Sequence, residues 1–118
     1  MVDTAVATSH PDSISYEVGD AGQISIFLKG NITIAEAKEL HGVLMEALSA
    51  DNDVNLHGAN IEKIDAAALQ LIGAFIAALQ SRNHSISWSS ASEALVRASS
   101  WVGMSKSLVL KDTDVVRA

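Results

Sequence analysis

The sequence predicts an α/β fold in which a mixed sheet of about four strands starts with a hairpin and carries three to four packed helices. Two runs of alternating apolar and polar residues, 14–18 and 23–29, flank a glycine-containing turn, which is the pattern of a β-hairpin. Beyond the hairpin, strand-like runs alternate with helix-like runs, which favours parallel strands joined by right-handed crossovers. A strongly apolar helix that begins at Ala66 and ends near 81–83 lies in the middle of this alternation.

The first helix is expected directly after the hairpin. Gly30 and Asn31 are expected to end the second strand, and Thr33 followed by Glu36 is a capping-box pattern. Helical spacing then continues to about Ser49. The residues expected to form its buried stripe are Ile34, Ala37, Leu40, Leu44 and Leu48.

The central helix has an unusually apolar sequence. Asp65 is a suitable N-cap, because its carboxylate can accept hydrogen bonds from the free N–H groups of the first turn. Gln70 is the only polar residue between Ala66 and Leu79, so most sides of this helix must be covered, by its own domain or by a partner. We expect the side chains that follow helical spacing to pack on the sheet: Leu69, Ile72, Ile76 and Leu79. The run is too short to cross a bilayer, which takes about 20 apolar residues.

Two further strands and one helix complete the expected order. The third strand is predicted at Val54–Gly58, with 59–63 leading into the central helix, and the fourth lies where Ile86 and Trp88 alternate with serines. Ser90 with Glu93 forms a second capping-box pattern. The last helix is expected to end at Gly103 as its C′ residue, and the apolar segment 108–110 is expected to pack on the edge of the core. The buried stripe of this helix is expected to consist of Ala94, Leu95, Ala98, Trp101 and Val102.

Composition indicates a single globular domain at 14–118, preceded by a flexible N-terminal arm at 1–13. The net charge of −6 disfavours a nucleic-acid surface, because phosphate binding needs clustered Lys and Arg. The absence of cysteine excludes disulfides and thiolate chemistry and fits a reducing compartment. Since neither a secretory signal nor a membrane-spanning run is visible, we expect a cytoplasmic protein without direct membrane insertion.

No catalytic or metal-binding pattern is present. The four histidines, His10, His41, His57 and His84, share neither a helical face nor a ligand spacing. No nucleophile elbow, phosphate-binding glycine loop or paired carboxylates occur. We therefore predict a non-enzymatic protein without a cofactor, in which Asp65 is either an ordinary helix cap or part of a binding site.

Three stretches in order resemble the STAS domain, the fold of bacterial anti-sigma factor antagonists. The strand, loop and helix start at 56–69, with Asp65-Ala66-Ala67-Ala68-Leu69, is similar to the family's strand and Asp-Ser/Thr-Ser/Ala/Thr-Gly-Leu motif. The segment 29–37 is similar to the family's Gly-x-Leu-Asp/Thr segment, and 90–103 to its Ser-x-x-hydrophobic helix. The resemblance covers about residues 14–110.

The resemblance implies a partner switch. Unphosphorylated antagonists of this family bind an anti-sigma factor that is also a serine kinase, and phosphorylation just after the Asp abolishes binding. A phosphate adds about −1.5 to −2 charges to the docking surface, which would repel the partner. The partner-binding positions carried over are Gly30, Asn31, Thr33, Asp65, Ala66, Ala67 and Ala68, and a phosphatase is a further expected partner.

This sequence departs from the family pattern at the phospho-acceptor. Ala66 and Ala67 occupy the hydroxyl positions, so neither can accept a phosphate, whether the alanines are native or engineered. His57 and Thr33 stand where many members have Asp. The alternatives are therefore a STAS subunit that docks an ATPase of a lipid-transport ABC system and a chemotaxis-linked STAS protein.

Overall fold

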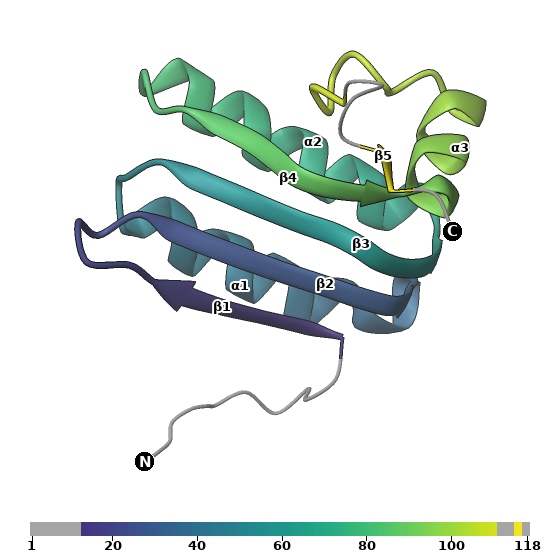
Figure 1. Cartoon of the computed structure of the whole chain (residues 1–118), viewed down its shortest axis with the longest axis horizontal. Helices are drawn as coiled ribbons and strands as arrows, with labels where there is room; N and C mark the ends of the chain where they lie inside the picture. Colours follow the sequence, from purple (N-terminus) through teal and green to yellow (C-terminus); the bar gives the residue numbers. More distant parts are fainter. Residues whose placement is uncertain (1–12, 111–114, 117–118) are drawn as a thin grey trace.

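The computed structural model describes residues 13–110 and 115–116 and confirms the predicted α/β fold (Figure 1). The first 12 residues, and with them most of the predicted arm, lie outside the described residues. The elements, in chain order, are β1 (Ile14–Val18), β2 (Ile24–Ile32), the 3-10 helix η2 (Ile34–Glu36), α1 (Ala37–Ser49), β3 (Val54–Ile64), α2 (Ala66–Ser81), β4 (Ile86–Ser92), α3 (Glu93–Trp101) and β5 (Val115–Val116).

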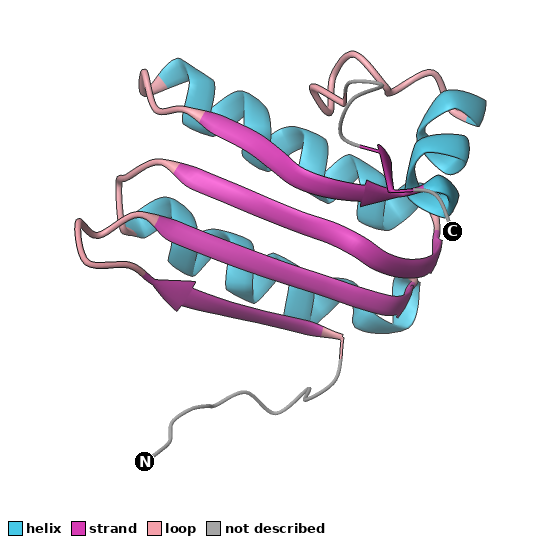
Figure 2. Cartoon of the chain, in the orientation of Figure 1, coloured by secondary structure: helices cyan, strands magenta, loops and turns pink. Residues whose placement is uncertain are grey.

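The sheet has the order β1-β2-β3-β4-β5, with a two-residue strand, β5, added to the four that the sequence predicts. The hairpin pair β1–β2 is antiparallel, and the later pairs are parallel, as expected. Helices α1 and α2 lie together on one face of the sheet, and α3 lies beside the end of β4 (Figures 1 and 2). In the part of the chain that the structure describes, the other face of the sheet carries no helix.

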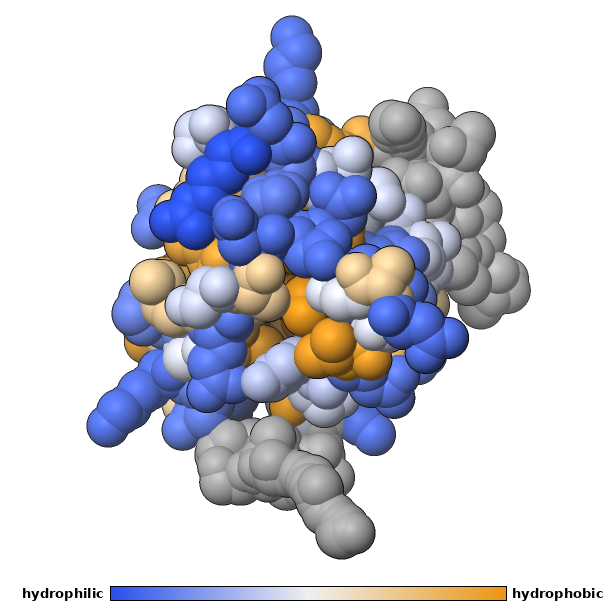
Figure 3. Space-filling model, turned by 90° about the vertical axis from the view of Figure 1, so that its left-hand side faces the viewer, coloured by the Kyte–Doolittle hydropathy of each residue, from blue (hydrophilic) through white to orange (hydrophobic). Residues whose placement is uncertain are grey.

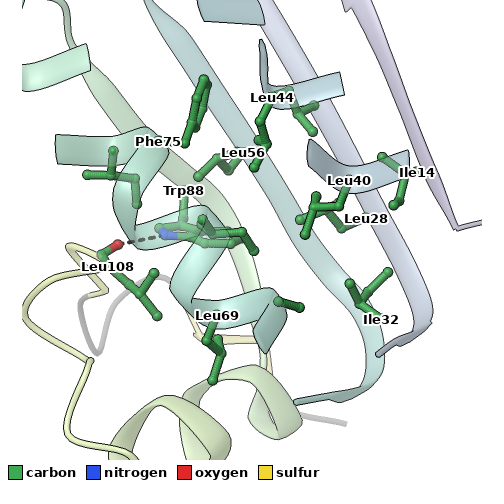
Figure 4. Close-up of a cluster of buried hydrophobic side chains, with 14 of the residues drawn as sticks. Ile14, Leu28, Ile32, Leu40, Leu44, Leu56, Leu69, Phe75, Trp88 and Leu108 are labelled. Carbon is green, nitrogen blue, oxygen red and sulfur yellow. Dashed lines mark hydrogen bonds between the residues drawn. The ribbon is translucent and has the colours of Figure 1, made fainter. Parts of the chain in front are cut away.

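The core lies between the sheet and the pair α1–α2 (Figure 4). Leu69, Ile72, Ile76 and Leu79 of α2 are each 0% exposed, which confirms the predicted buried face. The indole N–H of Trp88 donates to the carbonyl oxygen of Leu108 at 2.8 Å. This hydrogen bond ties the apolar 108–110 segment to the core, with Leu108 fully buried, as the sequence predicts.

The predicted ends of two strands were wrong. β2 continues through Gly30 and Asn31 to Ile32, and β3 continues beyond Gly58 to Ile64. Both strands are irregular there: their pairing register shifts between Phe27 and Lys29, and again between Gly30 and Asn31. Such bulges break the alternation of side chains without ending the pairing, and Gly30 accommodates one of them with a φ of 71°.

The outer helices differ from the predicted stripes. Ile34 is 68% exposed because it lies in the 3-10 helix, whose spacing differs from that of the α-helix that follows. Trp101 and Val102 are also exposed, at 81% and 45%, because α3 ends at Trp101. Ser99 of α3 is fully buried although it is polar, and its hydroxyl donates to the carbonyl oxygen of Leu95 at 2.8 Å.

The start of α3 also differs from the prediction, whereas its end agrees. Because β4 continues to Ser92, that residue replaces Ser90 as the N-cap, and its hydroxyl accepts the N–H of Leu95 at 3.0 Å. The end follows the predicted glycine pattern: Gly103 has a φ of 71°, and its N–H donates to Ser100.

The two ends of the sheet differ in character. The hairpin turn and the loops that follow α1 and α2 gather at one end, which is mostly hydrophilic in Figure 3. The helices η2 and α2 start at the opposite end, where the predicted site residues lie. Among the described residues, no helix combines the length and the apolar character needed to cross a membrane.

Candidate docking surface

The fold brings the two predicted site segments together. Strands β2 and β3 are parallel neighbours, so their carboxyl ends lie at the same end of the sheet, with Ile32 beside Ile64 in the register. The N–H of Asp65 donates to the carbonyl oxygen of Ile32 at 3.2 Å. The Gly30–Thr33 segment therefore lies next to the Asp65–Ala68 turn, which we call the knob.

The carboxylate of Asp65 uses one oxygen within the knob and the other to reach the residue that follows the Gly30–Thr33 segment. Oδ1 accepts the N–H of Ala68 at 3.1 Å, which is the predicted N-cap of α2. Oδ2 accepts the N–H of Ile34 at 2.7 Å, so the same side chain also holds the start of η2. We call this pair of hydrogen bonds the Asp65 clip. Its effect is to fix the knob against the Gly30–Thr33 segment.

Removing the Asp65 clip is expected to lower the free energy of unfolding. Asp65→Ala is expected to lower the free energy of unfolding by about 1.5–3 kcal/mol, because two main-chain N–H groups lose a charged acceptor. Chemical denaturation with urea measures the loss. Glu62→Ala is the matched control, since Glu62 is an exposed carboxylate three residues away. Equal losses for the two variants would contradict a structural role for the Asp65 carboxylate.

Thr33 and Glu36 form the predicted capping box at the start of η2. Oε1 of Glu36 accepts both the N–H and the hydroxyl of Thr33, each at 2.9 Å. The Thr33 N–H, and after it the Thr33 hydroxyl, hold the pKa of the Glu36 carboxyl below its ordinary value, although desolvation and the like charge of Asp65 both act to raise it. The Thr33 hydroxyl is therefore engaged within its own loop.

Part of the outer surface of this end consists of small or apolar side chains. Ala66 is exposed and Ala67 half-buried, whereas Ala68, the last residue of the knob, is fully buried. Next to them on η2 lies Ile34, with 68% of its surface exposed. Reasoning from the sequence missed Ile34, because helical spacing assigned it to the core. Asn31 is exposed as well, and Gly30 is half-buried.

The histidines do not gather. His41 is exposed on α1, and the ring of His57 stacks on that of Phe27 with 4.4 Å between the centroids. His84 Nε2 lies 2.8 Å from Asp51 Oδ1 at the opposite end of the sheet, and His10 falls outside the described residues. Within 13–110 and 115–116, no three His, Cys, Asp or Glu side chains form a group that could hold a metal ion.

Comparison with known families decides the relationship of this chain. Residues 18–111 match the sequence model of a family described as "Mlab, STAS domain". The chain belongs to this STAS-domain family. The family match and the order of strands and helices confirm the STAS resemblance seen in the sequence.

Solved structures share the STAS fold at low sequence identity. A candidate anti-sigma factor antagonist of Thermotoga maritima, TM1081, matches with a TM-score of 0.68 and 15% identity, over 89% of this chain and 86% of that one. An NMR structure of TM1081 gives a TM-score of 0.64 and 14% identity, over 95% and 90% of the two chains.

A partial match involves a much larger protein. A crystal structure of Mglu matches with a TM-score of 0.54 and 20% identity, over 63% of this STAS domain but only 18% of the Mglu chain. The likeness therefore concerns one part of that protein and its fold alone. No curated protein matches the chain at a significant level.

Proposed function

We propose that this STAS domain is a non-enzymatic docking module of the partner-switching kind, which binds an anti-sigma factor that is also a serine kinase. The observation that carries the proposal is the surface formed by Ile34, Ala66 and Ala67, which is exposed or half-buried, apolar and held in place by the Asp65 clip. Small side chains let a partner's backbone approach closely, and an exposed Ile supplies apolar area that a partner can bury.

The lack of basic residues in the two site segments supports a protein partner. No Lys or Arg lies in the Gly30–Thr33 segment or the knob, and the chain carries a net charge of −6. Both oxygens of Asp65 already accept main-chain hydrogen bonds, so the partner would contact apolar surface more than the carboxylate. The expected partner therefore presents an apolar groove.

The proposal is tested by identifying the bound protein. The full chain, immobilised through its C-terminus, is used to capture proteins from the source organism, and each captured protein is then purified and titrated by calorimetry. Capture and direct binding of a protein with a histidine-kinase-type ATP fold would support the proposal. If only an ABC ATPase binds directly, the switching function is wrong.

A second candidate, docking to the ATPase of a lipid-transport ABC system, is favoured by one specific observation. The knob contains no hydroxyl, because Ala66 and Ala67 occupy the positions where the family carries a phospho-acceptor. A subunit that stays bound to its partner has no need of a phosphate that would release it. The surface formed by Ile34 and the alanines would serve this partner equally well.

Phosphate uptake distinguishes the two candidates. Incubated with its kinase partner and ATP, the native chain is expected to take up no phosphate at the knob, whereas Ala66→Ser or Ala67→Ser should take up about one phosphate if the chain is a locked switch. Intact-mass spectrometry measures the uptake. Ser81→Ala is the control, since Ser81 lies at the far end of α2, about 22 Å away at 1.5 Å per residue.

One outcome would contradict the locked switch, and another would contradict the placement of the switch in the knob. If neither serine variant takes up phosphate while both fold and bind the kinase, constitutive docking is favoured over a locked switch. If the native chain takes up a full phosphate outside the knob and loses binding, the switch lies elsewhere.

A further inference from the structure

The helix-free face of the sheet carries a hollow that the docking proposal does not use. The hollow has a volume of about 410 Å³, and its lining comes from β1, β2, β3 and β4 together. The lining residues that matter for binding are Ser15, Phe27, Lys29, His57, Asn60 and Ser90. A second hollow of about 550 Å³ extends to Gly30 and Glu62, and it shares four lining residues with the first: Ser13, Lys29, Ala59 and Asn60.

Irregular strand pairing shapes this face. The β2–β3 register shifts between Phe27 and Lys29, and the β3–β4 register shifts between Leu56 and His57. Bulges of this kind bend a strand and re-aim its side chains, and they are common next to binding sites. Phe27, Lys29 and His57 all flank these two shifts, so the irregularities coincide with the hollow.

The lining combines a flat aromatic surface, formed by a phenyl and an imidazole ring, with one full positive charge. The rings of Phe27 and His57 stack with 4.4 Å between centroids and an interplanar angle of 16°. Lys29 is exposed, and within 13–110 and 115–116 it forms no ion pair. Hydroxyls of Ser15 and Ser90 and the amide of Asn60 supply hydrogen-bonding groups.

The charges of the surroundings narrow the class of ligand. Glu62 lines the second hollow, and the chain as a whole carries a net charge of −6. A polyanion such as a nucleoside triphosphate would face repulsion that one lysine does not offset. A single carboxylate can pair with Lys29 while an aromatic ring packs beside the Phe27–His57 pair.

We propose that this hollow is a binding site for a small aromatic monocarboxylate. The carboxylate of the ligand lies against Lys29, and its ring lies against the Phe27–His57 stack. The site lies on the sheet face, whereas the docking surface lies at the end of the sheet. Binding is therefore measured on the free chain, and its result does not depend on the proposed docking function.

The test uses naphthalene-2-carboxylate as the probe, titrated into the ¹⁵N-labelled full chain. Saturable amide shift changes are expected at Phe27, Lys29 and His57. Lys29→Met keeps the apolar stem of the side chain and is expected to weaken binding about tenfold, because the charged partner of the carboxylate is lost. The matched control is Lys38→Met, an exposed lysine on α1 at the helix-covered face, which should leave affinity unchanged.

Two further probes separate the contributions of charge and ring. The neutral naphthalene-2-carboxamide should bind about as weakly to the native chain as the carboxylate binds to Lys29→Met. Cyclohexanecarboxylate, which lacks a flat ring, should bind more weakly than the aromatic probe. The proposal is overturned if no saturable shifts occur around the hollow, or if Lys29→Met and Lys38→Met bind the probe equally. Melting curves establish that both variants fold.

Discussion

Ile72→Ala is expected to lower the free energy of unfolding by about 2–5 kcal/mol, which is a large part of the stability of a domain this size. Ile72 is 0% exposed and lies on the face of α2 that packs against the sheet. Truncation removes buried apolar area and leaves a cavity that neighbouring side chains fill only in part. Urea denaturation followed by circular dichroism measures the change.

Gln70→Ala is the matched control for that truncation. Gln70 is exposed on the same helix, and alanine is the better helix former, so stability should change by no more than about 0.5 kcal/mol. A loss below about 1 kcal/mol for Ile72→Ala would mean that this face of α2 does not form the core.

Ala67→Asp is expected to weaken binding of the protein partner about 100-fold or more while leaving the fold intact. The new carboxylate lies in the first turn of α2, where the helix dipole favours negative charge, so the melting temperature should change little. In the docked complex the same charge loses its water without gaining a cation, which costs several kcal/mol. Calorimetry with the purified partner measures the affinity.

Ala74→Glu separates the effect of position from that of net charge. It adds the same charge at an exposed site on the same helix, about 10 Å from position 67 at 1.5 Å per residue. Its affinity should therefore stay close to that of the native chain. If Ala67→Asp binds the partner as tightly as Ala74→Glu, the knob is not the docking site.

The elements that were predictable from sequence are those in which local pattern and packing agree. Helix α2 is apolar on almost every side, so its extent and its buried face followed directly from residue type. The Asp65 N-cap was predictable for the same reason, since it requires only a carboxylate before a helical run. The parallel order of the later strands followed from their alternation with helices.

The features that could not be predicted depend on contacts between distant residues. The second half of the Asp65 clip joins positions 31 residues apart, and no local pattern signals it. The full lengths of β2 and β3 were missed because bulges interrupt the alternation while the pairing continues. Ile34 and Trp101 were assigned to the core because helical periodicity was extended across a 3-10 helix and to a helix end.

The Asp65 clip also has a consequence for the kinetics of association. A surface built from two separate chain segments would lose backbone entropy if a partner had to order both of them. Here Gly30–Ile32 belongs to β2 and Ala66–Ala68 to α2, and in the free chain the Asp65 carboxylate already bonds the start of η2 at 2.7 Å and the first turn of α2 at 3.1 Å. Complex formation then needs little rearrangement of this chain, so variants that break the clip should slow the association rate even where every contacting side chain is unchanged.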